Sequence, residues 1–139
     1  MPTSTKRVRS SGSKKKTSKN VKLPSLYKVG KNTDYANNTF YRDKDGQLHR
    51  DDGPAVIYWD GEKRWYQHGK RHREDGPAVV ATNGTEIWYS NDIIHREDGP
   101  ALENGDGTVA WYKLGLVFEP NAHDIAVWKM SQKNQKKGS

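Results

Sequence analysis

The chain has 139 residues, of which 32% are apolar and 29% are charged, so we expect one domain with a thin core in which five Trp and seven Tyr supply most of the buried area. No run approaches the roughly 20 apolar residues that cross a bilayer, and the first residues lack the apolar segment of a secretory signal, so we expect neither feature. The absence of Cys excludes disulfides, thiolate catalysis and Cys-based zinc sites.

Positive charge is concentrated at the two ends of the chain. Residues 1–31 contain ten Lys and Arg and no acid, whereas all 17 Asp and Glu lie within residues 32–128, although the whole chain carries +7. Residues 1–31, called the basic arm below, are also rich in Ser and Gly, so we expect them to be flexible and disordered on their own. A solvated tail or a nuclear localisation signal is the alternative for this segment. The residues expected to bind nucleic acid or an acidic protein surface are Lys6, Arg7, Arg9, Lys14, Lys15, Lys16, Lys19 and Lys22.

One motif occurs three times with a period of 23 residues: HRDDGPA at 49–55, and HREDGPA at 72–78 and at 95–101. A Trp-Tyr pair follows the same period. Self-similarity at a fixed period is typical of stacked repeat arrays, so we expect residues 32–118 to form one β-repeat domain. The positions that carry the repeat, and that we expect to be structural, are His49, Gly53, Pro54, Trp65, His72, Gly76, Pro77, Trp88, His95, Gly99, Pro100 and Trp111.

Each repeat is predicted to contain two strands. Residues 55–59 (AVIYW) are rich in strand formers, and Asp60-Gly61 after them is typical of a two-residue hairpin turn, as is Asn83-Gly84 one repeat later. The return strand is expected to run through Trp65-Tyr66 as far as His68-Gly69. The letters HREDGP then supply a wide turn, in which Gly permits a positive φ and Pro begins the next strand. The expected fold is all-β, an elongated antiparallel β-meander of about seven strands built from hairpin repeats.

A short helix is expected to follow the repeats, within residues 119–130. Asn121 is predicted to be its N-cap, and Asp124 occupies the third helical position, where a negative charge favours the helix dipole. Trp128 and an apolar residue three positions earlier lie on one face of this helix, which we expect to cover the open end of the sheet. Residues 131–139 are expected to form a basic tail.

The repeated histidines could suggest a metal site or a catalytic site. Two strands separate His49, His72 and His95 from one another, so neighbouring imidazoles are expected to be about 10 Å apart, too far for one zinc ion. Three equivalent copies also offer equivalent environments, whereas general acid–base catalysis needs groups whose pKa values differ. We therefore expect no metal, no cofactor and no catalytic residue, and we expect each His to bond the acid of its own turn.

The aromatic residues alternate with arginines, which suggests two interpretations. Together they could stack on the bases of single-stranded nucleic acid. A thin sheet needs the same aromatic residues for its own core, and the middle of the chain is acidic, so core packing is the favoured interpretation. The arginines concerned are Arg64, Arg71, Arg73 and Arg96.

The H-R-[DE]-D-G-P-A motif with its later W-Y resembles a variant of the MORN repeats, in a form found in repeat proteins of tailed phages and large DNA viruses. The resemblance covers about residues 40–118. It implies an elongated antiparallel β-meander and an interaction role without established chemistry. The chain has Trp-Tyr where the standard repeat has Tyr-x-Gly, which argues against the lipid-binding role of standard arrays.

Three functions remain open from the sequence. The first is a non-enzymatic virion protein of capsid or tail, located in the virion or the host cytoplasm, whose array docks on other protein subunits or on itself. The second is a nucleic-acid or ribonucleoprotein-associated factor, whose basic ends follow phosphates. The third is a host-directed phage interaction protein. None of them needs a membrane or a small-molecule substrate.

Overall fold

The computed structural model describes residues 29–138, and the side chains as far as Lys133. The binding residues expected in the basic arm, from Lys6 to Lys22, lie outside the described residues. The first strand, β1 (Gly30–Thr33), begins two residues before the boundary expected at residue 32. Within residues 29–138, no helix is long and apolar enough to cross a membrane.

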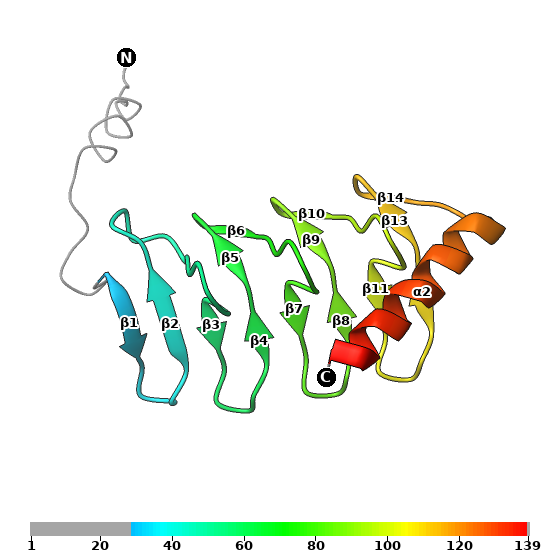
Figure 1. The fold of residues 1–139 in the computed structure, drawn as a ribbon. Coiled ribbons are helices and arrows are strands. Elements are labelled where there is room, and N and C mark those ends of the chain that lie inside the picture. Colours follow the sequence, from blue (N-terminus) through cyan, green and yellow to red (C-terminus); the bar gives the residue numbers. More distant parts are fainter. Residues whose placement is uncertain (1–28, 139) are drawn as a thin grey trace, which may run out of the picture.

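The described residues form mostly antiparallel β structure with one C-terminal helix, as expected. Eight short strands make one sheet, called the main sheet, in which spatial order follows chain order (Figure 1). The strands of the main sheet are β1, β2 (Thr39–Arg42), β3 (Val56–Ile57), β4 (Lys63–Arg64), β7 (Val79–Val80), β8 (Glu86–Ile87), β11 (Leu102–Glu103) and β12 (Val109–Ala110). Three small hairpins lie along the upper border in Figure 1. They are β5 (Tyr66–Gln67) with β6 (Lys70–Arg71), β9 (Tyr89–Ser90) with β10 (Ile93–Ile94), and β13 (Tyr112–Lys113) with β14 (Leu116–Val117).

The strands are shorter and more numerous than the sequence predicts. The strand expected at residues 55–59 is reduced to β3, although the antiparallel bonding continues through Ala55 N–H to Arg64 O (2.8 Å). The expected return strand is interrupted at Trp65, whose N–H bonds Ala78 O (2.7 Å) in the next part of the main sheet. After Trp65 the chain leaves the main sheet and enters a small hairpin. The single return strand predicted from the sequence is therefore two strands in the structure, β4 and β5.

The hairpins lie where the sequence places them, but their loops have three residues instead of two. Between β3 and β4, Gly61 N–H bonds Tyr58 O (2.9 Å), and Tyr58 N–H bonds Glu62 O (2.8 Å). Gly61 has a φ of 99°. A type I turn followed by a left-handed Gly is the usual three-residue hairpin loop, and the same bonds join Ala81 to Thr85 around Asn83-Gly84.

The core is thin, as the composition implies, and it is built mainly from small residues. Ala55, Ala78 and Ala101, which follow the Gly-Pro of each repeat, are fully buried. Val56 and Val79 stand next to the first two of them and are also buried. The buried position directly before β3, β7 and β11 is thus occupied by the same residue type at each repeat.

The C-terminal helix α2 (Ala122–Gly138) begins as predicted and continues further. Asp124 N–H bonds Asn121 Oδ1 (2.8 Å) and Asn121 N–H bonds Asp124 Oδ2 (2.9 Å), so the two residues form a reciprocal cap. The predicted end at residue 130 is wrong, because residues 131–137 contain no Gly or Pro and the helix reaches Gly138. Much of the expected basic tail is therefore helical.

The helix packs on the last part of the main sheet. The ring of Trp128 lies edge-on against Trp111, with 5.6 Å between ring centroids. Trp111 is buried and also meets Phe118 edge-on, at 6.0 Å. In Figure 1, α2 crosses in front of the C-terminal end of the sheet.

Candidate functional site

The arginines of the repeat loops (residues 49–54, 72–77 and 95–100) pack on aromatic rings of the preceding part of the chain. The guanidinium carbon of Arg73 lies 3.9 Å from the centre of the Trp65 ring, and that of Arg96 lies 4.0 Å from the Trp88 ring. Arg50 lies in the same way over Tyr41, at 4.0 Å. Each arginine also donates from Nη1 to the carbonyl oxygen of the proline in its own loop; the prolines are Pro54 (3.2 Å), Pro77 (3.0 Å) and Pro100 (3.1 Å).

The other arginines of the alternating pattern also lie over rings of this chain. Arg64 is 5.3 Å from the centre of the Tyr58 ring, and Arg71 is 4.1 Å from that of Tyr89. These cation–π contacts hold neighbouring parts of the array together. The arginines and aromatic residues of the alternating pattern therefore pack on one another within the chain.

The glycines of the repeat loops are needed for a reason that the sequence does not suggest. Gly53, Gly76 and Gly99 were expected to adopt a positive φ, and none of them does. Instead, a Cβ on Gly76 would lie 2.7 Å from the guanidinium carbon of Arg73, and the same clash arises at the other two positions. Glycine is present because the arginine folds back against it.

The repeated histidines connect each repeat loop to the next small hairpin. His72 Nε2 bonds the Glu74 carboxylate, and His72 Nδ1 accepts the backbone N–H of Asn91 (3.1 Å). Because a backbone N–H can only donate, Nδ1 must be unprotonated and Nε2 carries the hydrogen. His95 bonds Glu97 (2.7 Å) and accepts from Leu114 (2.9 Å) in the same way.

The bond from each His to the acid of its own turn was expected, whereas the bond to the following hairpin was not. The turn residues that donate to the histidines have positive φ, namely 46° at His68, 50° at Asn91 and 51° at Leu114. The second N–H of each of these turns donates to the backbone oxygen of the residue directly before the same histidine, for example Asp92 N–H to Arg71 O (2.9 Å). Every small hairpin is thus fixed on the loop before it.

The acidic side chains of the repeat loops are exposed, although each is paired with a His or Arg of its own loop. The side chains of Asp51, Glu74, Asp75 and Glu97 are 86%, 85%, 91% and 76% exposed. Open depressions of about 680 and 560 Å³ lie between successive loops. These four residues, called the acidic row below, follow the direction of the array.

The first repeat contains a cluster that the later repeats lack. His68 Nδ1 lies 2.8 Å from Asp43 Oδ2, and the rings of His49 and His68 stack with 4.1 Å between centroids. One ligand atom from each of these three residues lies within 4.8 Å of the other two. Burial raises the pKa of Asp43. Hydrogen bonds from His68 and from the backbone N–H groups of Gln47 and Asp45 lower it by more, so the pKa of Asp43 lies below the ordinary 3.8.

Sequence reasoning did not find Asp43 and His68 as candidate residues. The repeated histidines His49, His72 and His95 each bond the acid of their own loop, and only His49 belongs to the cluster. The available signal was that His68 stands where the next two repeats have Asn91 and Leu114. A histidine at a position where the other repeats have none is a candidate for a role outside the repeat.

Comparison of the chain with known protein families, with characterised proteins and with solved structures gives no match.

Proposed function

We propose that this chain is a non-enzymatic structural protein of a virion, associated with capsid or tail, which docks on other protein subunits through its β-repeat array. The array is an elongated meander of 23-residue units of the variant MORN type, and the basic arm contacts acidic surfaces or nucleic acid. The roles of the repeated residues support a scaffold, since the Arg, Gly and His of each loop are used in contacts between neighbouring units. An architectural role of this kind accounts for a motif written three times.

The observation that carries the proposal is that β1 is an edge strand in the part of the chain that the structure describes. Among the described residues, β1 pairs with β2 only. Tyr41 N–H in β2 bonds Ala55 O (2.7 Å), so the backbone of Tyr41 faces β3. In an antiparallel pair, Lys31 opposite Tyr41 then directs its own N–H and C=O away from β2, as does Thr33 two residues later. Such an edge is a template for a strand from another chain.

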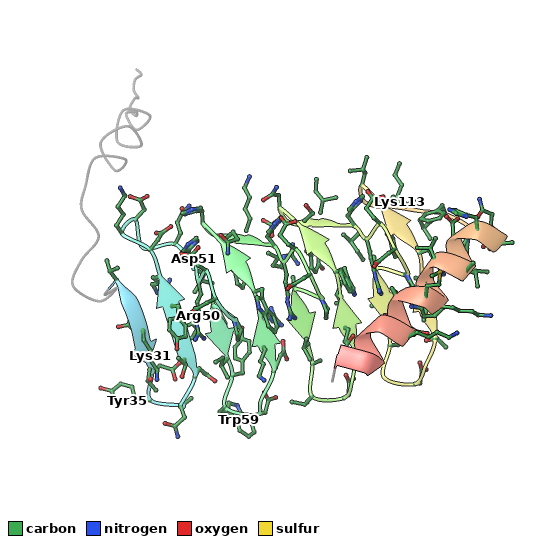
Figure 2. The ribbon with its side chains drawn as sticks, viewed as in Figure 1. Lys31, Tyr35, Arg50, Asp51, Trp59 and Lys113 are labelled. Carbon is green, nitrogen blue, oxygen red and sulfur yellow. The ribbon has the colours of Figure 1, made fainter. Side chains whose placement is uncertain are left out.

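The surroundings of this edge also favour contact with a protein. Tyr35, in the loop after β1, is fully exposed, and Trp59, in the loop after β3, is 72% exposed. Figure 2 shows Tyr35 at the lower corner near Lys31 and Trp59 at the lower end of the next hairpin. Exposed aromatic residues near an edge strand are typical of a surface that another protein covers.

At the opposite end of the array, α2 packs on the last repeat. There, α2 places Trp128 against Trp111, at the step where a further arginine would otherwise stack. Because β12 also pairs only with β11 among the described residues, the helix is what distinguishes this end from the β1 end.

The acidic row offers a second contact for a basic partner. Because its carboxylates are exposed and the basic arm of another copy carries no acid, the two surfaces are complementary. A second copy is thus a partner of the required charge, beside coat or tail subunits.

Mass spectrometry of purified particles tests the virion role, and we expect the chain to be present in them. Absence from particles would contradict the virion role and favour the nucleic-acid-associated or host-directed functions.

The docking edge is tested separately with Thr33→Pro, which removes the outward N–H of Thr33 without removing a bond to β2, and with Thr33→Val as the matched control. We expect the proline variant to lose its partner in pull-down or sedimentation while keeping the melting temperature of the control. Equal partner binding by both variants would show that β1 is not the docking edge.

A further inference from the structure

The three small hairpins meet the preceding repeat in equivalent ways, and only the first brings a second imidazole to that contact. Three residues meet at each contact. They are the residue before the turn of one hairpin, the histidine of the repeat loop that follows it, and the first turn residue of the next hairpin. The triplets are Asp43, His49 and His68 in the first repeat, Gln67, His72 and Asn91 in the second, and Ser90, His95 and Leu114 in the third. Only the first triplet consists of metal-ligating groups. We propose that Asp43, His49 and His68 bind one divalent transition-metal ion, with zinc as the best match.

The ligand set has the chemistry of a zinc site. Two imidazole nitrogens and one carboxylate oxygen form a three-ligand set of the kind found in open zinc sites, and the same combination also suits other first-row divalent ions. With zinc–ligand distances of about 2.0–2.2 Å, tetrahedral ligand atoms are about 3.3 Å apart. The Asp43 Oδ2 and His68 Nδ1 atoms, now 2.8 Å apart, would separate by about 0.5 Å around an ion that replaces their shared hydrogen.

Asp43 and His49 are held in place by other groups, whereas the exposed ring of His68 would turn out of its stack with His49 to direct Nδ1 at the ion. Asp43 Oδ1 accepts the backbone N–H groups of Asp45 (2.9 Å) and Gln47 (3.0 Å), which leaves Oδ2 directed at His68. The side chain of Asp43 is only 10% exposed. His49 Nε2 bonds Asp51 (3.0 Å), which is the carboxylate–histidine arrangement that orients a metal-binding imidazole.

The third ligand atom is His49 Nδ1, because Nε2 of that ring is bonded to Asp51. Nδ1 now accepts the backbone N–H of His68 at 3.0 Å. Metal binding breaks this bond and leaves the N–H to water, which the exposed position of the turn allows. The side chain of His68 is 68% exposed, so an ion and a water molecule in the fourth position can reach the site from solvent.

The experiment is a titration of the untagged full chain with ZnCl2 by calorimetry, together with NMR spectra of the imidazole nitrogens. We expect saturable binding of one zinc ion per chain. The nitrogen resonances of His49 and His68 should shift, whereas those of His72, His95 and His123 should not. The later histidines thus serve as references within the same molecule, because His72 and His95 make the same backbone contacts without a second imidazole.

Variants separate a metal site from a hydrogen-bonded cluster. His68→Asn copies the residue of the next hairpin, so it preserves the turn, and it should weaken zinc binding at least about tenfold. Asp43→Asn keeps the acceptor for the backbone N–H groups and should weaken binding as well. His123→Ala on α2 is the control and should bind like the native chain.

Three outcomes would overturn the assignment. They are the absence of saturable binding, unchanged affinity in His68→Asn, and zinc-induced shifts at His72 or His95. The result does not depend on particle association or on the β1 edge, so the site and the docking proposal can fail independently.

Discussion

Replacing Gly76 with Ala tests why glycine occurs in the repeat loops. If the arginine stacked on the preceding ring requires the space, the added methyl group displaces Arg73, because its Cβ would lie 2.7 Å from the guanidinium carbon. The far end of an arginine moves easily unless other contacts hold it. Here the guanidinium is held by the Trp65 ring at 3.9 Å and by Pro77 O at 3.0 Å.

The magnitude follows from these contacts. A partly buried cation–π contact contributes about 1 kcal/mol, and the hydrogen bond contributes about another 1 kcal/mol. Because the φ of Gly76 is not positive, alanine is allowed there and returns about 0.4–1 kcal/mol through the unfolded state. We expect a net loss of about 1–1.5 kcal/mol, or roughly 4–8 °C in melting temperature.

A double-mutant cycle measured by urea unfolding gives the decisive comparison. In an Arg73→Ala background nothing remains to be displaced, so Gly76→Ala should stabilise the chain by about 0.5 kcal/mol. Gly84→Ala is the control, because Gly84 has a φ of 92° and its replacement should cost about 1 kcal/mol in both backgrounds. An equal cost of Gly76→Ala with and without the arginine would refute the reasoning.

Three further predictions concern the end cap, a half-buried acid and the basic arm. Trp128→Ala should lower the free energy of unfolding by about 2–3 kcal/mol in urea titrations, because it removes the ring that covers Trp111, and an unchanged midpoint would contradict the capping role. Burial, and then the nearby charge of Glu103, raise the pKa of Glu86; such an acid destabilises the folded chain at neutral pH, and the penalty disappears as the pH falls through the raised pKa. Glu86→Gln should therefore be more stable than the native chain at neutral pH and equal to it in mild acid, as thermal melts at both conditions would reveal. The full chain should bind duplex DNA with a log–log salt slope near −5 if about six charges of the basic arm contact phosphate, and a truncated chain beginning at Val29, which keeps β1, should not; equal binding by both would transfer the role of the arm to a protein partner.

The local features of the fold are the ones that the sequence predicts well. The cap of α2 depends on Asn121 and Asp124, three residues apart, and the hairpin at Gly61 depends on a residue that accepts positive φ. Both are properties of a few adjacent residues. The loop length differed from the prediction because an Asp-Gly pair fits a two-residue turn and also the end of a three-residue loop.

The contacts between repeats were not predictable in the same way. The glycine of the repeat loop was assigned to backbone conformation, since nothing in the sequence shows that Arg73 turns back on its own loop. The pairing of Asp43 with His68 joins residues 25 positions apart, in a first repeat that departs from the 23-residue step. Only the folded chain shows which irregular residues meet.

The way in which the last repeat ends has a consequence for the evolution of the chain. Phe118 takes the place of the next histidine and Glu119 that of the next arginine, so a further hairpin would find no imidazole acceptor there, and no loop arginine is present to stack on Trp111. Inside the array, each hairpin is bound to the histidine of the loop before it, and Arg71 of one hairpin also contacts Tyr89 and Asp92 of the next. If the proposed 23-residue unit were duplicated in register, the new copy would carry the Arg and His that make these contacts. The length of such an array would therefore change by whole repeats.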